Sequence, residues 1–161
     1  MGYNKELSEQ LNKLRNSSTV IVGIGNTLKG DDGAGPLVCE QLRGKVCTEV
    51  IDAGTVPENY IQKIIKKTPK NLLIIDAIDF GASAGTINIF KPEQLDSFVL
   101  STHTLSPRLF VDMVCGNIQV DVYFVGIQPA QMQLGQPQSE QVNESIQLLA
   151  GTLAEIFPLR K

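Results

Sequence analysis

Two short stretches of the chain are apolar without any alternating polar positions. They span residues 20–22 and 72–75 and consist of valine, isoleucine and leucine. A strand that is buried on both faces of a parallel sheet has this pattern. The sequence therefore predicts two central parallel strands, and weaker apolar runs predict three more strands at 46–52, 85–90 and 120–127.

Elsewhere the apolar positions recur at helical spacing. Leu7, Leu11 and Leu14 predict an amphipathic helix within residues 1–18. Thr55 and Glu58 have the spacing of a capping box before another helix. The remaining helices are expected at 36–42, at 57–69, at 107–113 after the Ser106–Pro107 pair, and at 142–156.

The alternation of strand and helix signals predicts one domain over residues 1–161, with residues 1–18 as a helical amino-terminal extension. The expected fold is a three-layer α/β sandwich with about five mostly parallel strands. A chain of 161 residues, 42% of them hydrophobic, is long enough to bury one substantial core.

Charge and cysteine content narrow the class of protein. The net charge of -3 offers no basic field for nucleic acid or an anionic membrane, and no stretch approaches the ~20 apolar residues of a membrane span. Cys39, Cys47 and Cys115 form no CxxC pair, so we expect core-filling thiols rather than a disulfide framework or a zinc ribbon. A reducing cytoplasm is the expected location.

Acidic side chains follow both central strands. Asp32 comes after the glycine turn that ends the first strand, Asp76 directly follows the second, and His103 lies in the loop before the 107–113 helix. The carboxyl ends of parallel strands share one edge of a sheet, so we expect these three side chains to converge there. Two carboxylates and one imidazole suit nickel, zinc, manganese or iron, and three ligands leave coordination positions open.

Each of these residues also has a purely structural interpretation. Asp32 can interact with the dipole of the next helix, Asp76 can accept hydrogen bonds at a strand end, and His103 can be solvated. Asp31 is expected to cap its turn rather than bind metal, because adjacent side chains in a turn point in different directions. Asp52 is either a turn anchor or a site residue.

Two phosphate-binding motifs are incomplete. A GxGxxG dinucleotide fingerprint that starts at Gly23 and Gly25 would need glycine where Leu28 stands. In a P-loop, Asp31 and Asp32 would replace the lysine and the Ser/Thr, and carboxylates there repel phosphate.

The ordered set of segments GIGNTLKGDDGAG, IDAGTVPE, LLIIDAID, STHTLSP and VGIQP resembles the [NiFe] hydrogenase maturation proteases. It is most similar to the branch that serves formate-hydrogenlyase (hydrogenase 3) type enzymes, and the match extends from residue 19 to the last helix. The resemblance implies a peptidase/phosphorylase-like fold with one antiparallel strand. It also implies an endopeptidase that removes the carboxy-terminal extension of a nickel-loaded large-subunit precursor.

The resemblance also implies roles for particular residues. The metal-binding and catalytic positions of the family fall on Asp32, Asp76 and His103. The family's DGGT turn for substrate recognition becomes Asp52, Ala53, Gly54 and Thr55, with alanine in place of the usual glycine.

We expect nickel to arrive with the precursor, although such a site also accepts other divalent metals such as cadmium or zinc. The family is grouped with the aspartic peptidases, and the enzyme is expected to act as a monomer. Two alternatives remain open: a Rossmann-like nucleotide-binding module without peptidase activity, and a self-sufficient metallohydrolase that carries its own metal.

Overall fold

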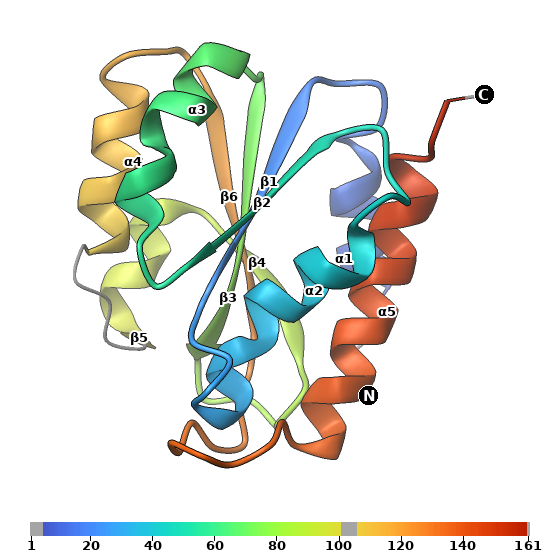
Figure 1. Cartoon of the computed structure of the whole chain (residues 1–161), viewed down its shortest axis with the longest axis vertical. Coiled ribbons are helices and arrows are strands. Elements are labelled where there is room, and N and C mark those ends of the chain that lie inside the picture. Colours follow the sequence, from blue (N-terminus) through green and yellow to red (C-terminus); the bar gives the residue numbers. More distant parts are fainter. Residues whose placement is uncertain (1–4, 101–105, 161) are drawn as a thin grey trace.

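A twisted sheet forms the centre of the molecule (Figure 1). The computed structural model describes residues 5–100 and 106–160. The strand order is β2–β1–β3–β6–β4, and a short strand, β5, pairs with β3 off this path. The strands are β1 (Thr19–Ile24), β2 (Glu49–Gly54), β3 (Asn71–Asp79), β4 (Ile87–Phe90), β5 (Val99–Leu100) and β6 (Asp121–Ile127).

Strand directions match the sequence-based expectation. The β1–β2, β1–β3 and β3–β6 pairs are parallel, whereas β4 runs antiparallel to β6. The two apolar runs form β1 and β3, which lie next to each other at the centre of the sheet, and all six residues of β1 are buried. The mostly parallel five-strand sheet with one antiparallel strand is therefore confirmed, and β5 is an addition that the sequence did not predict.

Helices cover both faces of the sheet, which confirms the three-layer arrangement (Figure 1). Side chains from α1 (Lys5–Asn12), α2 (Ala34–Leu42) and α5 (Glu140–Ile156) build the core on one face. Side chains from α3 (Ile61–Lys67) and α4 (Pro107–Cys115) build the core on the other. Leu7 and Leu11 of α1 are buried, so this helix is part of the first core, while its description as an extension to the domain stays a prediction.

The expected capping box and the expected burial of two of the cysteines were wrong. Thr55 and Glu58 form no capping box: a 3-10 turn, η2 (Pro57–Tyr60), precedes α3, and no side-chain cap bonds its amino end. Pro57 fixes its backbone at the first position of that turn, and short 3-10 turns are common where α-helices begin. Cys47 and Cys115 are exposed rather than core fillers, and only Cys39 is buried.

α2 packs unusually close to the two central strands at Gly35. A Cβ at this position would collide with the backbone carbonyl oxygens of Ile24 in β1 and Ile75 in β3. Backbone cannot move away as a flexible side chain can, so the sequence needs glycine here. This contact fixes the amino end of α2 against the carboxyl ends of β1 and β3.

We expect Gly35→Ala to lower the free energy of unfolding by about 3 kcal/mol, because the added methyl group overpacks a rigid contact. Urea denaturation measures the change. Gly151→Ala is the matched control: Gly151 lies in α5, and a Cβ added there would meet no atom within 4 Å, so alanine should stabilise the helix by about 0.5–1 kcal/mol. Equal stability of the Gly35→Ala protein and the wild type would contradict the close packing.

Within the described part of the chain, none of the helices is long and apolar enough to cross a membrane.

Candidate functional site

The turn after β1 holds two adjacent carboxylates with different surroundings. Asp31 and Asp32 lie in a 3-10 turn, η1 (Gly30–Gly33), and are 0% and 4% exposed. The backbone N–H of Asn26 donates to Asp32 Oδ2 at 3.0 Å. Asp32 Oδ1 is also buried, and no hydrogen-bond partner for it exists among the described residues. A buried acceptor without a partner costs about 1–3 kcal/mol, which makes this oxygen a candidate ligand for an incoming group.

Asp31 instead fastens a distant loop. Its carboxylate accepts hydrogen bonds from the backbone N–H groups of Ala130 (2.8 Å), Gln131 (3.3 Å) and Ser139 (2.6 Å), and from the Ser139 hydroxyl (2.9 Å). Ser139 in turn caps α5 by accepting from the Val142 N–H at 3.3 Å. Asp31 therefore has a structural role, but the expectation that it caps its own turn was wrong, because the partners of its carboxylate lie about a hundred residues away.

Asp76 lies on β3 immediately beyond the last residue that pairs with β1. The β1–β3 register ends at Gly23 and Ile75, whereas Asp76 pairs with Gly126 of β6. Asp76 is 2% exposed, and the η1 turn that carries Asp32 packs against the same strand. The expectation that the strand ends at Asp76 was wrong, because continued pairing with β6 and then with β5 extends β3 to Asp79.

His103 lies outside the described residues, so its convergence with the two carboxylates stays a prediction. Among the residues that the structure does describe, no three His, Cys, Asp or Glu side chains form a group that could hold a metal ion. The metal site inferred from sequence needs His103 as its third ligand.

The turn after β2 lies beside the β1 turn. Gly54 accepts a hydrogen bond from the Gly25 N–H at 2.8 Å, and its own N–H donates to Asp52 Oδ1 at 3.0 Å. Gly54 has a φ of 54°, a conformation that favours glycine, while Asp52 and Thr55 are exposed. Ala53 is 1% exposed and packs in the core, so the alanine that departs from the family pattern fits the turn.

Glu58 is a carboxylate whose role the sequence misassigned. Its Oε2 is buried and has no hydrogen-bond partner in the described part of the chain. It lies in η2, three positions after Thr55, and the spacing that suggested a capping box was the only sequence signal it gave. A second acceptor thus lies close in sequence to the turn after β2.

Gln128 holds the backbone beyond the carboxyl end of β3. Its side-chain oxygen accepts from the N–H groups of Phe80 and Ala82, and its amide nitrogen donates to Asp79 Oδ1 at 3.0 Å. This last hydrogen bond, more than that from the Gly81 N–H, lowers the pKa of Asp79. The interaction orders the chain next to Asp76.

Cys39 is unsuited to act as a nucleophile. Burial, with a smaller contribution from the negative charge of Asp52, raises its pKa to about 12, so the thiol stays protonated at neutral pH. The thiol lies 3.6 Å from the Ile51 carbonyl oxygen, to which it donates, and fills space between α2 and the sheet.

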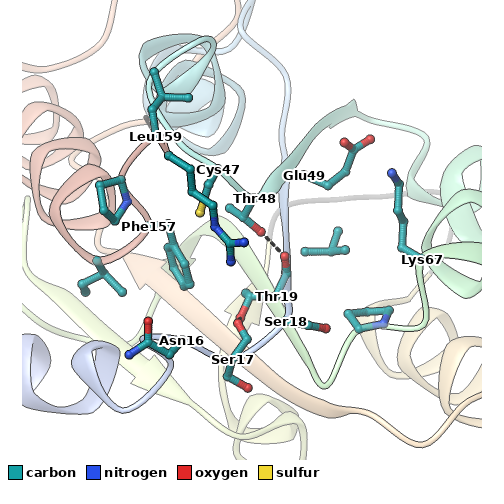
Figure 2. A pocket seen from close by; sticks show the side chains of 15 residues that line it. Asn16, Ser17, Ser18, Thr19, Cys47, Thr48, Glu49, Lys67, Phe157 and Leu159 are labelled. Carbon is teal, nitrogen blue, oxygen red and sulfur yellow. Dashed lines mark hydrogen bonds between the residues drawn. The ribbon is translucent and has the colours of Figure 1, made fainter.

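A cavity of about 680 Å³ lies at the opposite edge of the sheet (Figure 2). Its lining includes Ser18, Thr48, Glu49 and Lys67, and the Thr48 hydroxyl donates to the Thr19 carbonyl oxygen. These residues surround the amino ends of β1 and β2, away from the carboxyl-edge acids. Size alone therefore does not make this cavity the candidate site.

Comparison with known proteins agrees with the fold and identifies the family of the chain. The HycI family model, described as hydrogenase maturation protease, matches residues 38–156. The chain belongs to the hydrogenase maturation protease family. The matched range of this maturation protease contains Asp52, Asp76 and His103, and Asp32 lies just before it.

Individual relatives extend the comparison over most of the protease. The hydrogenase 3 maturation protease of Escherichia coli K12 is 35% identical over 131 residues, which cover 80% of this chain and 83% of that protein. A crystal structure of the [NiFe] hydrogenase maturation protease HycI from Thermococcus kodakarensis has a TM-score of 0.83 at 33% identity and covers 92% of this chain and 97% of that one. The solution structure of the E. coli endopeptidase HycI has a TM-score of 0.78 at 33% identity, with 86% and 90% coverage.

Family membership and geometry together favour an endopeptidase over a nucleotide-binding module. Two buried carboxylates occupy the turn where a dinucleotide phosphate would approach the backbone. The maturation protease therefore has two carboxylates at the edge where Rossmann-like proteins bind phosphate.

Proposed function

We propose that the protein is an endopeptidase that removes the carboxy-terminal extension from the nickel-loaded large-subunit precursor of a [NiFe] hydrogenase. The observation that carries the proposal is the buried Asp32 Oδ1, which lacks a partner among the described residues at the carboxyl edge of the sheet. A buried carboxylate oxygen without a hydrogen-bond partner is an acceptor that a group of the substrate can occupy. Membership in the hydrogenase maturation protease family supports a hydrogenase precursor as that substrate.

In this proposal Asp32, Asp76 and His103 complete the coordination of nickel that the precursor already carries. Asp32 contributes Oδ1, because the Asn26 N–H holds Oδ2 and so orients the carboxylate. Asp76 contributes from the neighbouring strand, against which the η1 turn packs. Two hard carboxylate oxygens together with one borderline imidazole nitrogen suit nickel, and cadmium or zinc would bind the same set.

Nickel at this position would polarise the scissile carbonyl or lower the pKa of a water molecule. The chain's own contribution is to place and orient the ligands. Burial of Asp32 and Asp76 in a water-poor environment strengthens their electrostatic interaction with a cation. The grouping of the enzyme with the aspartic peptidases follows the convention of the family, and we infer no pepsin-like pair of carboxylates that shares a proton.

Substrate recognition is proposed for the exposed turn at Asp52, Gly54 and Thr55. The Asx-type hydrogen bond from the Gly54 N–H to Asp52 and the bond between Gly25 and Gly54 keep this turn next to the β1 turn. A precursor segment that contacts Thr55 would therefore be held close to Asp32. The proposed enzyme works as a monomer in the cytoplasm.

Nickel dependence provides the direct test. We expect the purified protein to shorten nickel-loaded precursor and to leave nickel-free precursor intact, because the three protein ligands hold free metal weakly without the ligands of the substrate. Intact mass spectrometry of the products measures cleavage, and elemental analysis measures metal in the protease before mixing.

Cleavage of both precursor forms would contradict the nickel requirement. Stoichiometric metal in the protease as purified would instead favour the self-sufficient metallohydrolase. Saturable binding of a dinucleotide at micromolar concentration, with no processing, would favour the nucleotide-binding alternative.

A further inference from the structure

Leu28 and Leu134 are the most exposed large hydrophobic side chains in the described part of the chain. They are 68% and 74% exposed, respectively. Single exposed leucines are common on protein surfaces, but a pair on neighbouring turns next to a candidate active site is a feature of binding surfaces. We call these two residues and the turns that carry them the Leu28–Leu134 surface.

A backbone hydrogen bond joins the two turns at the leucines themselves. The N–H of Gly135, the residue after Leu134, donates to the carbonyl oxygen of Leu28 at 2.8 Å. In Figure 1 the chain between β1 and α2 and the orange loop before α5 meet at the lower end of the view. Two turns that are far apart in sequence therefore form one continuous surface.

Both turns are held firmly, so the exposed leucines belong to a preformed structure. The Gly30 N–H donates to the Gln136 carbonyl oxygen at 3.1 Å, and the Asp31 N–H donates to the Gln131 carbonyl oxygen at 3.0 Å. The four hydrogen bonds to the Asp31 carboxylate fix the same loop to the η1 turn. Such a surface loses little conformational entropy when it binds a partner.

The Leu28–Leu134 surface is continuous with the candidate active site. Leu28 lies in the same turn as Asn26 and Asp32, and its N–H donates to the Asn26 side chain at 2.9 Å. Asn26 in turn donates its N–H to Asp32 Oδ2. A peptide whose reacting bond lies at Asp32 must therefore pass close to Leu28.

The chemistry of the surface indicates a neutral, apolar occupant. Residues 128–139 contain no charged side chain, and glutamine is the most frequent residue among them. The charge next to Leu28 in sequence is Lys29, which is half-buried. A charged peptide or a nucleic acid would find few partners for its charges here.

We propose that the Leu28–Leu134 surface binds an uncharged, apolar segment of the protein substrate next to the scissile bond. The inference rests on the proposed peptidase function and adds a specificity-determining contact to it. The leucines act by positioning substrate, and they take no part in the chemical step.

The test compares Leu28→Ser, Leu134→Ser and the double variant with wild type, using nickel-loaded large-subunit precursor as the probe. We expect each single change to raise KM about fivefold and the double change to raise it further, with kcat altered less than about twofold, because the lost contact contributes to binding alone. Leu159→Ser is the matched control, since Leu159 is 56% exposed and lines the cavity at the opposite edge. Thermal unfolding verifies that all four variants are folded.

An unchanged KM in the double variant, or an equal rise in the Leu159→Ser control, would overturn the docking surface. Light scattering provides a second check. A wild-type dimer that is lost in the double variant would also overturn the proposal, because a second copy of the chain would then cover the leucines. Surface plasmon resonance separates this inference from the proposed function. The precursor could bind the double variant more weakly than the wild type and yet be cleaved by neither. That result would support the Leu28–Leu134 surface as a binding site and contradict the proposed peptidase function.

Discussion

Asp32→Ala is expected to abolish precursor processing while leaving the fold intact. The substitution removes Oδ1, the buried oxygen that has no partner among the described residues, and Oδ2, which accepts from the Asn26 N–H. We expect the rate of processing to fall by at least about a thousandfold, the scale seen when a group that stabilises the transition state is lost. Mass spectrometry of precursor in a single-turnover assay measures the rate.

Stability separates a catalytic role of Asp32 from a structural one. Asp32→Ala breaks one hydrogen bond and removes a buried, unsatisfied oxygen, so the two effects on the free energy of unfolding oppose each other and we expect a change within about 1 kcal/mol. Asp32→Glu should retain part of the activity, because the carboxylate is kept, although the longer side chain places it at a different distance from the backbone. Asp121→Ala, an exposed aspartate at the amino end of β6, should process precursor like wild type. Wild-type cleavage by Asp32→Ala would reduce Asp32 to a partner of the α2 amino end.

Asp31→Ala, unlike Asp32→Ala, is expected to lower the stability of the fold strongly. Four donors from Ala130, Gln131 and Ser139 would lose their buried acceptor. We expect the free energy of unfolding to fall by about 3–5 kcal/mol, because several charge-assisted hydrogen bonds disappear at once. Urea denaturation measures the loss, and limited proteolysis of the native protein locates it to the 128–139 loop.

Asp31→Asn provides the graded comparison. The amide keeps one acceptor oxygen and the side-chain volume, but its NH₂ group faces N–H donors, so we expect an intermediate loss of stability. A loss below about 1 kcal/mol in Asp31→Ala would show that the loop does not depend on this carboxylate. The pair Asp31 and Asp32 would then lack the division of roles that the hydrogen bonds indicate.

The sequence predicted those parts of the fold that depend on local pattern. The apolar runs of β1 and β3 and the helical spacing of α5 reflect which faces of these elements are buried. The type of each element could therefore be predicted from the sequence. β5 has two residues and exists only because β3 is long enough to pair with it, which no local pattern encodes. The 3-10 turn at Pro57–Tyr60 stands where a capping box was expected, because Pro57 fixes the backbone at its first position and no side chain caps its amino end.

The candidate site shows the same division. Placement of Asp32 and Asp76 near one edge follows from the order of strands and helices, which the sequence contains. The partners of Asp31 lie in the 128–139 loop, and only the folded chain brings them together. The buried oxygen of Glu58 was equally hidden from a pattern that counts spacing.

The hydrogen bond between the Gly25 N–H and the Gly54 carbonyl oxygen has a mechanical consequence. It joins the Asp52–Thr55 turn, proposed to recognise the substrate, to the turn after β1 that carries Asp32. A movement of either turn would therefore displace the other. A poorly matched precursor that distorts the Asp52–Thr55 turn would transmit that distortion through this hydrogen bond and the adjacent β1–β2 pairing to Asn26 and the carboxylate it orients. Substrate discrimination and turnover would then be coupled through the backbone that joins these two turns.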